Sequence, residues 1–134
     1  MENLYSLMKS IYTDSHTDVE KNLSLNEKNI NTTDKYGCTP LMYAAFHNSH
    51  KVAHLLIERG AHLEASNLHG KTPLMFACEN DSKEVFELLL NNGANPLQTN
   101  IHGDSVIEVA EALGFRDILR TLKAKGYETN NSLR

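Results

Sequence analysis

A six-residue pattern recurs at a fixed distance along the chain, and this repeat restricts the possible folds more than any other feature. Residues 37–42 read GCTPLM, residues 70–75 read GKTPLM, and residues 103–108 read, more loosely, GDSVIE. Each copy begins 33 residues after the one before it. The same offset links Ala44, Ala77 and Ala110, Val52, Val85 and Ile118, Leu56, Leu89 and Leu122, and Gly60, Gly93 and Gly126. A period of this length predicts an array of similar structural units.

Each unit begins with a short predicted helix. Thr39-Pro40 and Thr72-Pro73 are helix starts, because a threonine side chain can accept a hydrogen bond from the first turn and proline suits the first helical position. Ser105 and Glu108 have the spacing of a capping box, which marks a third start. Nine residues after each start stand Asn48, Asp81 and Gly114, three residue types that tolerate a left-handed backbone. We expect the chain to turn there.

A second helix follows each turn. Its apolar residues have the three- and four-residue spacing that places them on one helix face, and a glycine C-cap ends it. These residues are Val52, Leu55 and Leu56, then Val85, Leu88 and Leu89, then Ile118 and Leu122. Two short helices cannot bury such a face alone, so stability must come from stacking the units. The junctions, such as residues 65–70, are short and rich in turn residues, which predicts projecting hairpin-like fingers.

The pattern resembles the ankyrin repeat, whose unit reads roughly D-x-x-G-x-T-P-L-H-x-A-A, a connection, a leucine-rich helix and G-A-D-x-N. Residues 34–66 and 67–99 match it closely. Residues 100–126 lack the proline and are interpreted as a C-terminal capping repeat, followed by a polar tail at 127–134. Residues 1–33 keep only a few positions in register, and we interpret them as an atypical N-terminal repeat. Those positions are Met8, Ile11, Val19, Leu23 and Ile30-Asn31.

This resemblance implies a single domain over residues 1–134 with an all-α fold. About four helix-turn-helix units would stack into a solenoid, with fingers projecting from the junctions. One departure from the family pattern affects stability. Ankyrin repeats usually have histidine after Thr-Pro-Leu, where its ring joins a polar network with the threonine, but Met42, Met75 and Glu108 occupy that place here. The hydrogen bonds of that histidine must therefore be absent or replaced.

Composition and charge weigh against several functional classes. The net charge of -4 and the pI of about 5.9 provide no general attraction to nucleic acid or to anionic lipid. No run of about 18 apolar residues is present in the sequence, as a membrane-spanning helix would need. Cys38 and Cys78 form no paired-thiol motif and are expected to be free thiols, with Cys78 packed as an apolar residue. We therefore expect a cytoplasmic location.

Several histidines and Cys38 raise the possibility of metal binding or catalysis. His50 and His54 have a spacing used in zinc sites, with His47 across the turn, but no convincing further ligand is evident. His69 and His102 stand one repeat apart, too far to share one ion. Cys38 precedes a helix start, where a thiolate is favoured, yet no orienting acid or oxyanion motif accompanies it. We expect an exposed finger cysteine, no cofactor and no enzymatic activity.

The leading interpretation is a non-enzymatic protein-protein interaction module that acts as an adaptor or an inhibitor. The small size of the chain favours the inhibitor, and we expect a monomer when no partner is bound. The alternative function is a histidine-dependent metal or redox accessory protein. Metal analysis of the purified protein would separate the two.

The resemblance also implies a binding site. In ankyrin repeats, the fingers and the first helices line a concave face that binds proteins, and the two residues before each finger glycine project toward the partner. Tyr36, Leu68 and Ile101 would therefore form an apolar row that core packing does not require. The complete predicted site consists of Lys35, Tyr36, Cys38, Phe46, His47, Leu68, His69, Lys71, Glu79, Asn80, Ile101, His102, Asp104 and Leu113.

Overall fold

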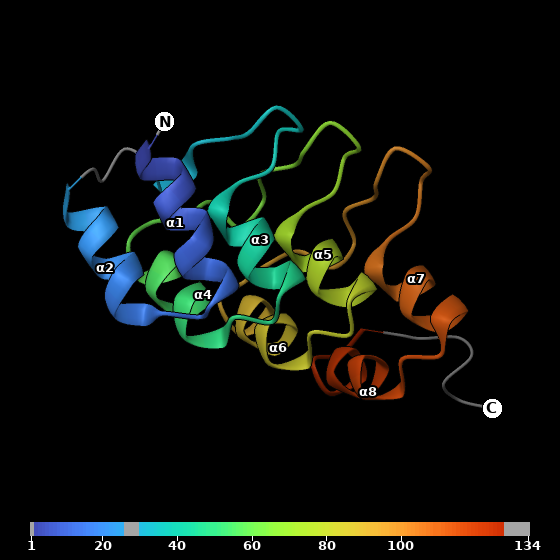
Figure 1. Cartoon of the computed structure of the whole chain (residues 1–134). Coiled ribbons are helices and arrows are strands. Elements are labelled where there is room, and N and C mark those ends of the chain that lie inside the picture. The colour runs from blue at the N-terminus through green and yellow to red at the C-terminus, as the bar shows by residue number, and fades with distance from the viewer. Residues whose placement is uncertain (1, 26–29, 128–134) are drawn as a thin grey trace.

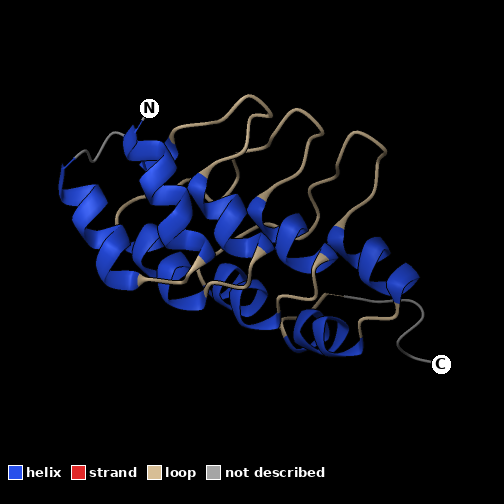
Figure 2. Ribbon diagram, in the orientation of Figure 1, coloured by secondary structure: helices blue, strands red, loops and turns tan. Residues whose placement is uncertain are grey.

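The computed structural model describes residues 2–25 and 30–127, and within these ranges all regular secondary structure is helical (Figure 2). Each short helix is followed by a tight turn and a second helix, which confirms the predicted all-α class. The helices are α1 (Glu2–Tyr12), α2 (His16–Leu25), α3 (Pro40–Phe46), α4 (His50–Glu58), α5 (Pro73–Glu79), α6 (Lys83–Asn91), α7 (Val106–Leu113) and α8 (Arg116–Ala124).

The helix pairs stack side by side into a solenoid with two layers (Figure 1). We call α1, α3, α5 and α7 the inner helices and α2, α4, α6 and α8 the outer helices. Neighbouring helices pack within each layer, and the apolar core fills the space between the layers. Three loops project from the stack beside the inner helices, as the sequence predicted. We call the loops at residues 34–38, 67–71 and 100–104 the first, second and third fingers.

The predicted helix starts are present, and they explain how methionine replaces the usual histidine. The Thr39 and Thr72 hydroxyls each accept a hydrogen bond from the amide of the methionine three residues later, over 3.3 Å. In return, the Met42 and Met75 sulfur atoms accept hydrogen bonds from the two threonine amides, over 3.4 Å. Sulfur is a weak acceptor, but here it satisfies a buried amide that would otherwise lack a partner. Ser105 and Glu108 form the predicted capping box.

The turn inside each pair also follows the prediction. Asn48, Asp81 and Gly114 all have left-handed backbone conformations, with φ of 53°, 51° and 71°. The structure adds a fourth such residue, Asp14, with φ of 50°, between α1 and α2. The first helix pair is therefore built like the others, although its sequence keeps few of the repeat positions.

Turn residues also connect each of the first two helix pairs to the pair that follows it. The Asp14 carboxylate accepts a hydrogen bond from the Val52 amide over 3.3 Å, and the Asn48 side-chain oxygen accepts one from the Val85 amide over 3.2 Å. Both amides lie in the first turn of an outer helix, where no partner within the helix exists. In addition, the buried Ser49 hydroxyl donates to the Ile11 carbonyl over 2.7 Å. The first pair is thus joined to the stack by polar as well as apolar contacts.

Two details of the core differ from the sequence-based expectation. Leu88 is only half-buried, whereas Phe86 is fully buried and is the largest fully buried side chain in the described residues. Tyr127 belongs to the predicted polar tail, but it is partly buried and packs against the core. Its amide donates a hydrogen bond to the Leu122 carbonyl over 3.0 Å. The rest of the predicted tail, residues 128–134, lies outside the described residues, as does the side chain of Leu23.

Candidate protein interface

Each finger is a tight turn held by its first residue. The side-chain oxygens of Asp34, Asn67 and Asn100 each accept hydrogen bonds from the amides two and four residues later, over 2.8–3.1 Å. The backbone amide of the same residue donates to the carbonyl four residues later over 3.0 Å, which closes the finger at its base. Short polar side chains favour turns for this reason. The three fingers therefore have one conformation and present their tip residues in the same way.

The fingers also contact one another through their backbones. The Leu68 amide donates to the Tyr36 carbonyl over 3.0 Å, and the Ile101 amide donates to the His69 carbonyl over 3.1 Å. This close approach requires glycine at Gly70, because its φ is +70° and a Cβ atom there would lie 3.0 Å from the Ile101 nitrogen. The tips consequently form a continuous, regularly spaced row.

A pocket of about 280 Å³ lies between the first two fingers and the inner helices α3 and α5. Its wall is mainly aromatic, with Tyr36 from a finger tip, Tyr43 and Phe46 from α3, and Phe76 from α5. Tyr43 and Phe76 are equivalent residues in successive units. The full lining, which we call the aromatic pocket, consists of Tyr36, Cys38, Met42, Tyr43, Phe46, His47, Asn67, His69, Lys71 and Phe76.

A second pocket of about 320 Å³ adjoins the first and extends the site onto α1. Tyr43 and His47 line both pockets, and the rest of the second lining is Met8, Lys9 and Tyr12. The His47 ring lies edge-on between two aromatic neighbours, 5.1 Å from the ring centre of Tyr12 and 4.9 Å from that of Phe46. Phe46 in turn approaches Phe76, with 6.5 Å between ring centres. Aromatic side chains from three successive inner helices thus form one continuous surface.

Hydrogen bonds hold the polar groups beside the aromatic pocket. The Tyr43 hydroxyl donates to the Asp34 carboxylate. Partial burial acts to raise the pKa of Asp34, but the hydrogen bonds from Tyr43 and from the Cys38 and Tyr36 amides outweigh it and lower this pKa. Burial, together with the same hydrogen bond, raises the pKa of Tyr43 well above its ordinary value. At neutral pH this pair is therefore a phenol bound to a carboxylate, and it fixes the tyrosine ring in the pocket wall.

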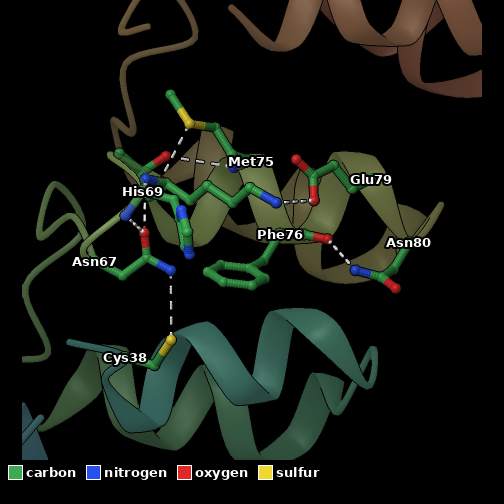
Figure 3. A network of polar contacts seen from close by, with 9 residues as sticks. Cys38, Asn67, His69, Met75, Phe76, Glu79 and Asn80 are labelled. Carbon is green, nitrogen blue, oxygen red and sulfur yellow. Dashed lines mark hydrogen bonds and ion pairs between the residues drawn. The ribbon is translucent and has the colours of Figure 1, made fainter. Parts of the chain in front are cut away.

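The second finger supplies the opposite wall. Figure 3 shows the Asn67 amide group pointing toward Cys38 of the preceding unit, and its nitrogen lies 3.5 Å from the Cys38 sulfur. The Lys71 ammonium group lies 5.7 Å from the centre of the Phe76 ring and 2.9 Å from the Glu79 carboxylate. Both charged side chains are about 30% exposed. Lys71 thus lines the pocket, where Tyr36 and Phe46 remain about half-exposed.

Most of the predicted site residues are exposed, but the pocket brings only some of them together. Tyr36, Phe46, His47 and His69 are exposed and line it, and Lys71 is half-buried there. Cys38 lines the pocket as well. The remaining predicted residues line neither pocket: Lys35, Leu68, Ile101 and His102 at the finger tips, half-buried Asp104 in the third finger, and Glu79, Asn80 and Leu113 at the ends of inner helices. The expectation that the apolar finger residues face solvent is confirmed for Tyr36, Leu68 and Ile101, which are 53%, 71% and 60% exposed.

The prediction that Cys38 is an exposed finger residue is wrong. Its side chain is only 9% exposed, because it lies at the base of the first finger, where the Asn67 side chain of the second finger reaches it. The next unit in the stack therefore shields Cys38 from solvent. Cys78 is fully buried, as expected for a packed apolar residue, and burial raises its pKa to about 12. Both thiols are free.

Several pocket residues are not among the predicted site residues: Met42, Tyr43, Asn67, Phe76, Met8, Lys9 and Tyr12. The sequence nevertheless contains a signal that could have identified some of these residues. Tyr43 precedes Phe46 by three residues, so the two share one helix face. Phe76 is the equivalent of Tyr43 in the next unit, and Tyr12 ends α1 as Phe46 ends α3. Following the inner-helix face through the repeat would have found all three aromatic residues.

The histidines that suggested a metal site do not meet in the described part of the chain. No group of three or more histidine, cysteine, aspartate or glutamate side chains there could hold a metal ion. Instead, the His54 ring nitrogen lies 3.0 Å from the Glu58 carboxylate one turn later. His47 lies among aromatic rings.

We therefore expect the purified protein to contain less than about 0.1 zinc ion per chain, because stable zinc sites need three or four ligands at about 2.0–2.3 Å. Elemental analysis after dialysis measures this directly. One zinc ion per chain, together with a drop of several degrees in melting temperature after chelation, would show that the metal hypothesis is correct.

Stacked helix pairs with an exposed row of loops define a class of solenoid proteins whose extended surface serves for binding. A family model described as ankyrin repeats, in three copies, matches residues 7–100 and again residues 64–132. The chain therefore belongs to the ankyrin repeat family. Ankyrin repeats generally mediate protein-protein interactions and are typically non-enzymatic. No curated protein matches the chain. Within the described residues, no helix has the length and apolar character needed to cross a membrane.

Proposed function

We propose that this protein is a non-enzymatic adaptor or inhibitor that binds a partner protein through the face formed by its fingers and inner helices. The observation that carries the proposal is the pair of adjoining aromatic pockets on that face. Large apolar groups exposed on a folded protein mark interaction sites when they are contiguous. Aromatic residues in a pocket are also the groups that most often dominate binding energy at interfaces.

Several features of this face suit a protein partner. The finger tips form a regularly spaced row with apolar side chains at Tyr36, Leu68 and Ile101, next to polar groups at Lys35, His69 and His102. Interfaces commonly combine an apolar centre with a polar rim. The fingers are held by hydrogen bonds within and between them, so little conformational freedom is lost on binding.

We also propose how the chain is divided into repeats and where in the cell it is located. Residues 1–33 act as an atypical first repeat, 34–66 and 67–99 as full repeats, and 100–126 as a C-terminal capping repeat. The turn at Asp14 and the packing of α1 and α2 against α3 and α4 support the first assignment. The protein is a monomer until it meets its partner. Its two free thiols favour a reducing compartment such as the cytoplasm.

The test of this function is a double substitution on the finger row. Tyr36→Ala combined with Ile101→Ala should weaken binding to the native partner by about 30-fold or more, since it removes two exposed apolar anchors. The partner is first identified by a pull-down from the native cell, and affinities are then measured with the purified pair. Helical content and melting temperature should stay nearly unchanged, because both side chains are mostly exposed.

Leu97→Ala is the matched control, because Leu97 is 59% exposed but belongs to neither a finger nor a pocket. It should bind like the unmodified protein. If the double variant binds with undiminished affinity, the finger face is not the interface, and the outer helices become the surface to test.

A further inference from the structure

The aromatic side chains of the finger face are concentrated in the interval between its first two fingers. In the next interval, Glu79 and Asn80 occupy the places of Phe46 and His47, and Val109 occupies that of Phe76. Likewise, His69 replaces Tyr36 at the finger tip. Both intervals lie between two fingers and two inner helices, and they differ in these side chains. A partner group that needs an aromatic-lined pocket therefore binds at the N-terminal half of the face.

The size of the aromatic pocket limits what it can hold. Its volume of about 280 Å³ is at the lower end of the roughly 300–1,000 Å³ of small-ligand sites. Phe46 and Tyr36 both line it and are 47% and 53% exposed. Aromatic side chains pack well against such rings in edge-on or offset geometry. A single aromatic side chain of a partner segment fits these dimensions and this lining.

The charge around the two pockets is positive, although the chain as a whole carries -4. The described residues that line the two pockets include Lys9 and Lys71 and no carboxylate. Lys35 lies at the rim, with its ammonium group 5.1 Å from the centre of the Tyr36 ring. Two carboxylates lie nearby: Glu79 is ion-paired with Lys71, and Asp34 accepts hydrogen bonds from Tyr43 and two finger amides. Lys9, Lys35 and Lys71 against Asp34 and Glu79 leave a local excess of positive charge.

This arrangement argues against a cationic guest such as a lysine side chain. Aromatic pockets can bind cations through the ring faces. Here, however, the ammonium groups of Lys35 and Lys71 already lie near the Tyr36 and Phe76 rings. A further cation would be repelled by both, whereas a carboxylate next to the pocket would be attracted to Lys9 and Lys35.

We propose that the aromatic pocket binds an aromatic side chain of the partner protein, and that acidic residues beside it in the partner sequence contact Lys9 and Lys35. This inference rests on the proposed function and specifies the chemistry of the partner. The pocket supplies most of the affinity, because it buries apolar surface. The lysines determine orientation and preference for acidic over basic segments, as charges at the rim of an interface do.

A selection from displayed random peptides on the complete, immobilised chain tests the proposal. The enriched peptides should share an aromatic residue with aspartate or glutamate within a few positions. One enriched peptide is then synthesised together with a version in which its acidic residues are replaced by lysine, and fluorescence anisotropy measures both affinities. The acidic peptide should bind at least about tenfold more tightly, and added salt should reduce this difference.

Substitutions then assign the two contributions. Phe46→Ala should lower the affinity for the acidic peptide by about 30-fold or more. The double substitution Lys9→Glu and Lys35→Glu should reverse the preference for the acidic peptide, so that the peptide with lysine in place of the acidic residues binds more tightly. The matched controls are Leu97→Ala for the apolar change, and Lys51→Glu with Lys123→Glu, two exposed lysines on outer helices, for the charge change. All variants should keep the helical content of the unmodified protein.

The outcomes separate this inference from the proposed function. Enriched peptides whose binding depends on Phe46 but which lack acidic residues would overturn the inference. The finger face would remain the binding surface. Peptides whose binding withstands both Phe46→Ala and Tyr36→Ala would overturn the inference and count against the finger face as well. A selection that enriches no peptide would also contradict the inference, since the pocket would then not hold an isolated aromatic side chain.

Discussion

Replacing Phe86 with alanine should lower the free energy of unfolding by about 3–5 kcal/mol, the largest loss expected from a single substitution in this chain. Phe86 is fully buried in α6, which packs between the outer helices α4 and α8. The substitution removes an entire aromatic ring from a site with neighbours on both sides, so the surrounding helices can close the resulting cavity only in part. Equilibrium denaturation with urea, followed by circular dichroism, measures the loss.

Phe46→Ala makes the same chemical change on the surface and serves as the matched control. Phe46 is about half-exposed at the end of α3, so its removal should cost less than about 1 kcal/mol. Comparable losses for the two variants would mean that the aromatic pocket, rather than the space between the layers, carries much of the stability.

The second large effect concerns the position of a repeat within the stack. Leu89→Ala should cost about 2–5 kcal/mol, and Leu122→Ala, the equivalent change one unit later, should cost less. Both side chains are fully buried. The difference arises because α6 contacts outer helices on both sides, whereas within the described residues the only outer helix that packs against α8 is α6, so α8 can shift to fill the cavity.

Urea denaturation of the two single variants under the same conditions gives this ranking. Equal slopes of the unfolding free energy against urea concentration are needed for the comparison, because a changed slope would indicate separate unfolding of the terminal pair. A larger loss for Leu122→Ala would show that the C-terminal pair, and not the middle of the stack, limits the stability of the array.

The features that the sequence determined are those set by neighbouring residues. Thr39-Pro40 and Thr72-Pro73 begin helices because capping requires only residues within one turn. Asn48, Asp81 and Gly114 end the first helices because few other residue types adopt a left-handed backbone readily. Repetition of these local signals every 33 residues was enough to predict the helix pairs, the fingers and their stacking.

Tertiary structure decided the features that depend on distances between repeats. Cys38 is buried because Asn67 of the next finger reaches it, and Tyr43, Phe46 and Phe76 form one pocket because α3 and α5 pack side by side. Phe86 is fully buried and Leu88 only half-buried, although both belong to α6, which packs between α4 and α8. A repeat pattern describes one unit and its period, whereas burial and pocket shape depend on the particular side chains that two neighbouring units bring into contact.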